Sequence, residues 1–390
     1  MSNFLNFYLE NKVHPVNQDI SDLKLHFKRR VDLYREIGLP QIVFNCKDVL
    51  EVAPGSGYNS IVTASLGLKS FDLIEPNLTG YNEMLALFDK MSISDKVLNF
   101  YNLTLENFID NKLYDIVLCE GLLPGLDSNL LFLNNLKSKV KEHGILVVTT
   151  IDSVSIFFET LRSYLAVLLI KFNKLEKFDQ KVDILTKAFS SHLSTLVGMS
   201  RSVNDWVIDN LINPASITMG NENQFSFPIA IENIKDDFIF YGSSPNFISN
   251  YKWYKDVQDS KTYNLSIIED YYSKVHNLIN KNEIGNSTIM DNKSLINLTK
   301  QFSEIVENKY KCLSYDEQFE QKSIKNDLLI LKDIYDLLYK NSLHNSSKAI
   351  LEFISLFEDD KIPNVSEINN MTYFKSAFGR GQQYVSFVKS

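Results

Sequence analysis

The chain has 390 residues, enough for two or three domains at about 150 residues each. Hydrophobic residues make up 44% of it, with only 14 Gly and 9 Pro, so collagen-like, low-complexity and wholly disordered classes are excluded. The formal net charge of −8 argues against general binding to nucleic acid or anionic membranes, because both require a basic surplus.

The three cysteines, Cys46, Cys119 and Cys312, are widely spaced and form neither a disulfide framework nor a zinc-binding pair. The N-terminus lacks the basic segment and apolar run of a secretory signal. The longest apolar stretch, residues 164–170, is about a third of the roughly 20 residues that a membrane helix needs. We therefore expect a cytoplasmic protein without a membrane span, and a buried helix around residues 164–170.

Residues 20–37 place Phe27, Val31 and Tyr34 at helical spacing ahead of two stop signals, Gly38 and Pro40, which predicts an amphipathic helix. The chain then alternates between short apolar runs and helical stretches. The runs lack polar alternation, as is typical of parallel strands buried on both faces. They span residues 48–53, 71–76, 96–101, 114–120 and 144–152. This pattern predicts a doubly wound α/β sheet.

After residue 152 the pattern changes to long helices that continue to about residue 212. A strand-like segment at 236–242 follows, and then a helical block at roughly 262–358. The alternation of side chains in residues 379–389 predicts a last strand. Because this strand lies so far from its partners in sequence, we infer helical elaborations on one sheet rather than independent domains.

The most informative segment is Glu51-Val52-Ala53-Pro54-Gly55-Ser56-Gly57, where a buried strand ends at a glycine-containing turn before a helix. Backbone N–H groups and the conformational freedom of glycine let a ligand approach such a turn closely. A dinucleotide fold would show GxGxxG, but Ser60 occupies the third glycine position. The nicotinamide interpretation is weaker for that reason, and an ordinary β–α turn remains the alternative.

The same segment resembles the first motif of class I S-adenosylmethionine-dependent methyltransferases, in which an acid ends the strand and the turn runs G-x-G-x-G. The resemblance implies that Glu51 lies near the methionine end of the cofactor and that Gly55 and Gly57 shape its cradle. Ala53 departs from the pattern, because it stands where the first glycine usually lies. Alanine adds only a methyl group, so we expect the turn to tolerate it.

Further acids and polar residues follow the next strands. Glu75 ends the second apolar run, and a carboxylate there can accept hydrogen bonds from both ribose hydroxyls. Its alternative role is that of an exposed loop residue. Glu120 and Gly121 end a run that resembles the fourth strand of the family, at the edge where open α/β sheets bind ligands. Asn102, after the third strand, is placed near the adenine by topology.

The resemblance covers residues 46–152 and, with the strands near 237 and 384, implies a Rossmann-like, seven-stranded and mostly parallel sheet. Several further segments, including CEGLLPGLD and GRGQQYVSF, resemble a long bacterial methyltransferase group associated with surface-polysaccharide or other sugar pathways. This implies carbohydrate biosynthesis and a small-molecule acceptor such as a sugar or nucleotide sugar. The implied division is an N-terminal helical lid (1–45), a cofactor-binding core (46–152), an acceptor-side helical insertion (153–235), a core strand and loop (236–254), a second helical insertion (255–375) and a final core strand (376–390).

Methyl transfer from a sulfonium is an in-line displacement, and a hydroxyl acceptor must also lose its proton. We expect the base in the insertion after the fifth strand. His192 is the first candidate, because an ordinary imidazole pKa near 6.5 suits proton removal at neutral pH. Asp152 and Asp205 are rival bases. A structural role for His192, and helix capping by either aspartate, are the alternatives.

Two residues of the same insertion suit an acceptor. Arg201 can hold a sugar carboxylate or phosphate through its guanidinium, or form a salt bridge. Trp206 can stack on a sugar face or pack in the core. The sequence contains no metal-binding motif, so we expect no metal. The block at 262–358 fits a homo-oligomer interface or packing on its own sheet.

The sequence thus predicts a cytoplasmic S-adenosylmethionine-dependent methyltransferase that acts on an oxygen of a sugar or similar small polar metabolite. One alternative is a regulatory module that binds the cofactor without catalysis, which Ala53 and the large insertions favour. Another is a nicotinamide-dependent enzyme on the same sheet.

Overall fold

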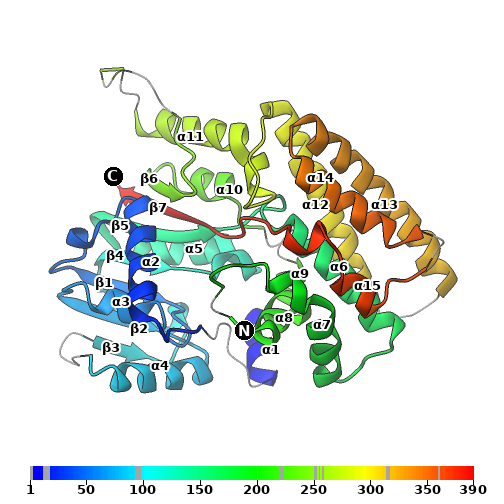
Figure 1. Ribbon diagram of the computed structural model, residues 1–390. Coiled ribbons are helices and arrows are strands. Elements are labelled where there is room, and N and C mark those ends of the chain that lie inside the picture. The colour runs from blue at the N-terminus through cyan, green and yellow to red at the C-terminus, as the bar shows by residue number, and fades with distance from the viewer. Residues whose placement is uncertain are drawn as a thin grey trace. The chain divides into compact units, whose positions relative to one another are not determined.

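The chain forms two compact units in the computed structural model (Figure 1). The structure describes residues 3–11, 18–93, 98–199, 201–218, 224–249, 253, 255–256, 259–312, 317–358 and 361–390. Unit 1 comprises residues 1–150, 225–271 and 382–390, and unit 2 comprises residues 151–224 and 272–381. The predicted lid, 1–45, includes residues 1–2 and 12–17, which lie outside the described residues.

Unit 1 is built on a seven-stranded sheet in the order β3-β2-β1-β4-β5-β7-β6. Among the described strands, β7 alone runs opposite to the others, antiparallel to its neighbours β5 and β6. The strands are β1 (Asp48–Val52), β2 (Ser70–Ile74), β3 (Leu98–Tyr101), β4 (Tyr114–Cys119), β5 (Val140–Thr150), β6 (Phe238–Ser244) and β7 (Gln383–Lys389). This confirms the predicted Rossmann-like sheet. The chain order reverses between β1 and β4, and open α/β sheets bind ligands at that point.

The boundaries differ from the sequence-based expectation in two strands. β5 begins at Val140 instead of residue 144 and ends at Thr150, so Asp152 lies beyond the strand. β6 begins at Phe238 and extends to Ser244, two residues past the predicted end. Pairing with β7 accounts for both changes at the carboxyl ends, because Thr150 and Ser244 pair with the first residues of that strand.

The helices of unit 1 lie mainly between successive strands. They are α1 (Asn3–Asn11), α2 (Leu23–Glu36), α3 (Ser60–Ala64), α4 (Leu78–Lys90), α5 (Asn129–Ser138), α10 (Phe227–Glu232) and most of α11 (Ser260–Lys274), with the 3₁₀ turns η1 (Gln41–Val43), η3 (Leu105–Asn107) and η4 (Leu123–Gly125). The Asp22 carboxylate caps α2 by accepting the Leu25 N–H at 2.9 Å. Gly38, with φ of 82°, follows the end of α2.

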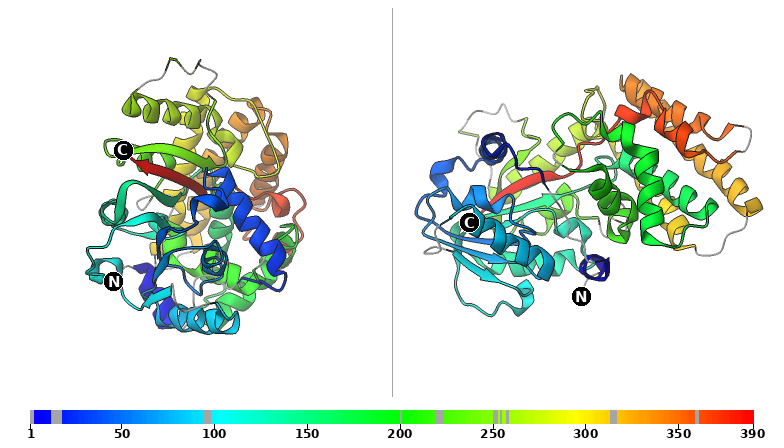
Figure 2. Two further views of the ribbon diagram at one scale, coloured as in Figure 1. Left: turned by 90° about the vertical axis from the view of Figure 1, so that its left-hand side faces the viewer. Right: turned by 60° about the horizontal axis from the view of Figure 1, so that its bottom comes forward.

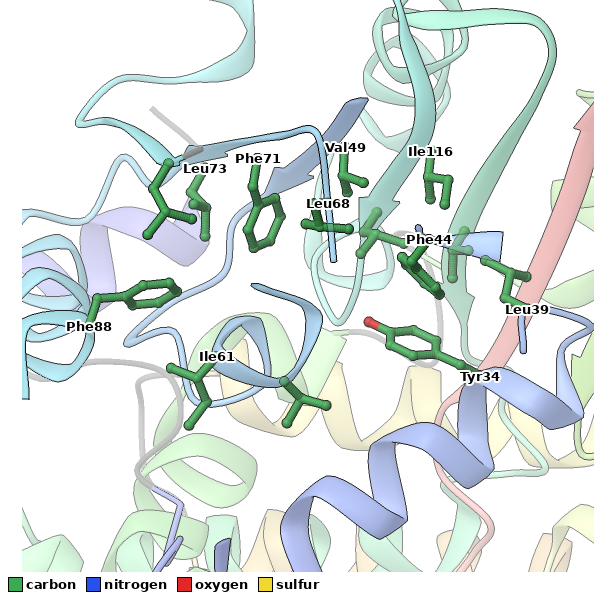
Figure 3. Close-up of a cluster of buried hydrophobic side chains, with 14 of the residues drawn as sticks. Tyr34, Leu39, Phe44, Val49, Ile61, Leu68, Phe71, Leu73, Phe88 and Ile116 are labelled. Atoms are coloured by element: carbon green, nitrogen blue, oxygen red, sulfur yellow. The ribbon is translucent and has the colours of Figure 1, made fainter. Parts of the chain in front are cut away.

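The face of α2 that packs inward differs from the predicted one. Of the three residues expected on its apolar face, only Tyr34 is buried, whereas Phe27 is 36% exposed and Val31 is half-buried. Tyr34 joins a core cluster with residues of β1, β2, α3 and α4, and its ring lies 5.1 Å from that of Phe44 (Figure 3). Arg30, one turn before Tyr34, is also buried. A polar residue therefore occupies the inward face, which a search for apolar periodicity does not detect.

Unit 2 is helical in its described residues. It contains α6 (Phe157–Phe172), α7 (Phe178–Leu193), α8 (Val203–Val207), the π-helical turn η5 (Ile208–Ile212), α9 (Pro214–Thr218), η6 (Val275–Leu278), α12 (Ile289–Lys311), α13 (Glu317–Lys340), α14 (His344–Ser355), α15 (Val365–Asn369) and η8 (Phe374–Ser376). α12, α13 and α14 lie side by side (Figures 1 and 2). Helix α6 contains the stretch 164–170 and is buried at twelve of its sixteen residues, as predicted.

The two predicted insertions pack together in unit 2. The Tyr164 hydroxyl of α6 donates to Asp327 of α13 at 2.8 Å, which joins the first insertion to the second. The structure thus gathers residues 151–224 and 272–381 into a compact unit of their own, because their apolar helical faces bury one another. Helix α10, expected in the first insertion, belongs to unit 1, and so does helix α11, expected in the second, through residue 271. Among the described residues, no helix is long and apolar enough to cross a membrane.

Candidate functional site

The turn between β1 and α3 contains three residues with positive φ, which are Ala53 at 60°, Gly55 at 59° and Gly57 at 76°. A Cβ added to Gly55 would meet no described atom within 4 Å. A Cβ added to Gly57 would lie only 2.8 Å from Met84 Cγ. The turn therefore presents bare backbone to open space at Gly55 and packs closely against α4 at Gly57.

Ala53 adopts the left-handed conformation that favours glycine. For an alanine this costs roughly 1–2 kcal/mol. The sheet holds the residue in place, since its N–H donates to the Ile74 carbonyl at 2.8 Å. Alanine thus adopts a glycine-like conformation at this position, at the expense of some backbone strain.

Glu75 connects the ends of β1 and β2. Its Oε2 accepts the Gly55 N–H at 2.7 Å and its Oε1 accepts the Asn77 N–H at 2.8 Å. The side chain is buried, and this burial raises its pKa to about 7 although the two backbone N–H groups favour the charged form. Asn102 Nδ2 donates to the Glu75 carbonyl at 2.8 Å. Glu75 is therefore a buried carboxylate beside the open turn, not an exposed loop residue.

Two more carboxylates lie at the carboxyl ends of β1 and β4. Glu51 is 5% exposed, and its Oε2 has no hydrogen-bond partner among the described residues. Burial first, and then the negative charge of Glu120, raise the pKa of Glu51 to about 8. Gly121 follows Glu120 with φ of 81° and donates its N–H to Thr149 Oγ1 at 2.7 Å.

Sequence reasoning missed the residue that pairs with Glu120. Arg30 Nη2, on α2, donates to both carboxylate oxygens of Glu120, at 2.7 and 2.8 Å. It also donates to the Tyr34 hydroxyl at 2.9 Å, and that hydroxyl lies 3.1 Å from Thr63 Oγ1 on α3. Arg30 thereby fastens α2 to the carboxyl ends of the central strands.

Besides Arg30 and Tyr34, a third residue of α2 has a polar contact in unit 1, and this one reaches the glycine-rich turn. His26 Nε2 lies 2.7 Å from the Tyr58 carbonyl oxygen. Burial lowers the pKa of this half-buried imidazole, so the neutral form with Nε2–H as donor fits the contact. His26, Arg30 and Tyr34 are spaced by four residues, which places them on one helical face. In the sequence, the pattern H-x-x-x-R-x-x-x-Y could have indicated this polar face of the helix.

His192 lies in unit 2 and does not have the surroundings of a general base. It is fully buried, its Nδ1 lies 3.3 Å from Arg162 Nε, and its Nε2 lies 2.8 Å from the Ile368 carbonyl oxygen. Burial and the charge of Arg162 lower its pKa to about 3. Both ring nitrogens are engaged and no surface is left for an acceptor. The structure corrects the expectation of a catalytic His192 in favour of the structural alternative.

Asp152 and Asp205 both serve local backbone structure. The buried Asp152 accepts the N–H groups of Val154 and Ser155 through Oδ1, each at 2.9 Å. Asp205 accepts the Ser202 hydroxyl at 2.7 Å, and its own N–H donates to Ser202 Oγ at 3.0 Å. Ser202 is thus the cap of α8 and Asp205 supports it. Neither aspartate is the helix cap of the capping alternative, because Ile156 is the N-cap residue of α6 and Ser202 that of α8; both support the local backbone instead.

The two predicted acceptor-binding residues also have partners within unit 2. Arg201 Nη2 donates to Asp209 Oδ2 at 2.6 Å, which is the salt-bridge alternative. Trp206 is buried, with its ring 6.4 Å from that of Phe378 in an edge-to-face arrangement, which is the core-packing alternative. In the described part of the chain, no three His, Cys, Asp or Glu side chains are grouped as a metal site would require.

The predicted cofactor-binding residues, unlike the catalytic ones, gather in one place. Glu51, Ala53, Gly55, Gly57, Glu75, Asn102, Glu120 and Gly121 all lie in or directly after β1 to β4, at the carboxyl ends of parallel strands. The one antiparallel strand stands between β5 and β6. This is a Rossmann-like fold. Burial raises the pKa of Glu51 and of Glu75, and Arg30 pairs with Glu120, so a cationic ligand would favour the ionised form of the first two.

Comparison with known proteins gives partial matches. No family model matches the chain. It is 27% identical over 135 residues to the ubiquinone biosynthesis O-methyltransferase of Rickettsia typhi, which covers 34% of this chain and 47% of that protein. The enzyme of the same name from Rickettsia bellii is 24% identical over 148 residues, which cover 37% of this chain and 54% of that protein. The chain thus spans about half the length of the curated relatives it matches.

Solved structures that resemble the chain include the N-methyltransferase NodS from Bradyrhizobium japonicum in complex with S-adenosylhomocysteine. The TM-score is 0.31 at 13% identity, over 39% of this chain and 75% of that one. A second is an S-adenosylmethionine-dependent methyltransferase from Clostridium acetobutylicum. Its TM-score is 0.29 at 16% identity, over 33% of this chain and 52% of that one.

Proposed function

We propose that this protein is an S-adenosylmethionine-dependent methyltransferase. One observation carries the proposal, namely the open backbone of Gly55 next to the buried carboxylate of Glu75, at the point where the strand order reverses. The local similarity to methyltransferases supports it. An ordinary β–α turn has no need of this arrangement, because it would place neither strained backbone nor a buried acid there.

The residues at the strand ends suit the parts of the cofactor. Each oxygen of the Glu75 carboxylate accepts one backbone N–H and retains capacity for a second donor, so Glu75 would hold the ribose hydroxyls. The unpartnered Oε2 of Glu51 would accept from the ammonium group of the methionine part. Asn102 fixes the loop after β2, on the side proposed for the adenine. When bound, the cofactor supplies a methyl group on a sulfonium, ready for displacement by a nucleophile.

For the acceptor we propose an oxygen of a small polar metabolite. The curated relatives are named as O-methyltransferases of ubiquinone biosynthesis, which supports oxygen as the acceptor atom. A sugar or nucleotide sugar stays the first acceptor class to test, on the sequence resemblance alone. His192, Asp152 and Asp205 are not proposed as bases, because each has the structural partners described above.

The decisive experiment is calorimetric titration of S-adenosylhomocysteine into the wild type and Gly55→Ala. Backbone strain should cost this variant roughly 1–2 kcal/mol of stability. Its new methyl group would project into the space proposed for the cofactor, so we expect affinity to fall at least tenfold. Gly67→Ala is the control, because Gly67 has φ of 77° but precedes β2 at the opposite edge of the sheet. A Cβ there would lie 2.8 Å from Asn45 Oδ1, so this variant should lose at least as much stability as Gly55→Ala without a change in affinity. Equal affinity in all three proteins would refute the site.

A labelled methyl group tests the reaction itself. Radiolabelled S-adenosylmethionine is incubated with the protein and with pools of sugars, nucleotide sugars and phenols. Transfer to a hydroxyl of any pool supports the proposal, and the reactive pool identifies the acceptor class. Binding of S-adenosylhomocysteine without transfer to any pool would favour the regulatory module. Binding of NAD in its place would favour the nicotinamide alternative.

A further inference from the structure

We propose that Arg30 is a positioning residue of the cofactor site, which holds the Glu120 carboxylate in place and thereby sets the negative charge that Glu51 presents to a cationic cofactor. The inference rests on the proposed function and names a residue outside the glycine-rich turn. It assigns to α2 an electrostatic role in ligand binding, in addition to its packing on the core.

Arg30 and Glu120 form a buried ion pair. The side chains of Arg30 and Glu120 are 7% and 9% exposed, and one nitrogen of Arg30 reaches both oxygens of Glu120. Its guanidinium carbon lies 4.8 Å from the centre of the Tyr34 ring. Removing one member of a buried pair leaves the other charge without compensation. A flexible surface arginine could not fix a carboxylate in this way, because its side chain would be mobile and hydrated.

Glu51 lies on the strand beside this pair, because β1 and β4 are parallel neighbours and Glu51 is opposite Leu118, two residues before Glu120. The charge of Glu120 favours the protonated form of Glu51, and the charge of Arg30 favours the ionised form. The other titratable groups that interact with Glu51 or with the pair are Glu75 after β2, Cys119 on β4, Tyr34 and His26 on α2, and Tyr384 on β7. Cys119 and Tyr34 are neutral at physiological pH, because burial raises both pKa values.

The arrangement predicts opposite effects for the two members of the pair. Without the Arg30 charge, Glu120 repels the ionised form of Glu51, so Glu51 keeps its proton to higher pH and binds an ammonium group less well. Without the Glu120 charge, Arg30 attracts the ionised form, and Glu51 loses its proton at lower pH. A purely structural pair would behave differently, since loss of either member loosens α2 in the same way.

The test is the pH dependence of S-adenosylhomocysteine binding, measured by calorimetry from pH 6 to 9. Relative to the wild type, we expect the midpoint of the rise in affinity to move up by on the order of one pH unit in Arg30→Met and down in Glu120→Gln. The double variant should return near the wild-type midpoint. Arg29→Met is the matched control, because it removes the same charge from an exposed neighbour on the same helix. The ammonium group of the ligand titrates alike in every variant.

The outcomes separate the two proposals. Failure of the wild type to bind S-adenosylhomocysteine at any pH overturns the proposed function. Binding with midpoints that stay fixed, or that move in the same direction in Arg30→Met and Glu120→Gln, overturns the role of Arg30 alone. If Arg30→Met does not fold, Arg30→Lys replaces it, because lysine keeps the positive charge and its single nitrogen can still contact the Glu120 carboxylate. A wild-type midpoint in Arg30→Lys then supports the proposal, and the alkaline shift of a lost charge overturns it.

Discussion

Replacing Glu51 by glutamine should stabilise the protein without ligand at high pH. A buried carboxyl whose pKa is raised holds its proton in the folded state at pH values where the unfolded chain has lost it. For Glu51 the rise is from the ordinary 4.5 to about 8. Stability therefore falls as pH increases between these values, and the full penalty is present above pH 8. Glutamine does not titrate, so Glu51→Gln should lack this part of the pH dependence.

The expected size follows from the same shift. A difference of 3.5 pKa units at about 1.4 kcal/mol each amounts to on the order of 5 kcal/mol. The structural effects of the substitution, such as an imperfect hydrogen bond of the new amide, do not depend on pH. The gap in unfolding free energy between variant and wild type should therefore grow by several kcal/mol from pH 5 to pH 8.5.

Urea denaturation followed by circular dichroism at pH 5, 7 and 8.5 measures this gap. Glu142→Gln is the control, because it makes the same substitution at an exposed glutamate of β5 in the same sheet. A gap for Glu51→Gln that stays constant, or that favours the wild type as pH rises, would show that Glu51 is ionised without penalty. S-adenosylhomocysteine should narrow the gap at pH 8.5, because only the carboxylate of the wild type pairs with its ammonium group.

Three further predictions concern single residues. Glu75→Ala should lower the melting temperature, because it frees two backbone N–H groups. It should also lower the affinity for S-adenosylhomocysteine at least tenfold, because it removes the proposed ribose ligand. Unchanged affinity in calorimetry would exclude that role. Ala53→Gly should raise the free energy of unfolding by up to about 1 kcal/mol in urea denaturation, because the relief of left-handed strain exceeds the conformational entropy that glycine adds to the unfolded chain. A clear loss of stability would contradict this. His192→Ala should lose roughly 1–3 kcal/mol of stability while the folded fraction keeps its turnover in the labelled-methyl assay. A hundredfold loss of turnover in a stable His192→Ala protein would restore the histidine as base.

The cofactor side was accessible from the sequence because its signals are local. The acid of Glu51 and the glycines of the turn lie within seven residues of one another, and a strand that ends at such a turn places them at one edge of the sheet. Glu75 could be placed by the same rule, since the strands β1 and β2 are parallel neighbours. Its burial and its bonds to backbone N–H groups appear only when the two strand ends meet.

The acceptor side was not accessible, because residue type says little about surroundings. His192 reads as a base by its ordinary pKa, but Ile368 and Arg162 surround it from 176 and 30 residues away. Arg201 and Trp206 each had a structural alternative, and their contacts match it. From the sequence, the catalytic and structural roles of such a residue can be compared only by the chemistry of its side chain. Its burial and its contact partners in the structure distinguish the two roles.

By itself, the sequence determined the Rossmann-like sheet and the acid–glycine turn, because hydrophobic periodicity and turn chemistry act over a few residues. Only the tertiary structure decided that α2 turns a polar face inward and that Arg30 meets Glu120, which is 90 residues away. It also decided that the helices after β5 bury their faces against those of 289–355 in one unit. Contacts between distant segments depend on how whole elements pack, and no local pattern of residues records that packing.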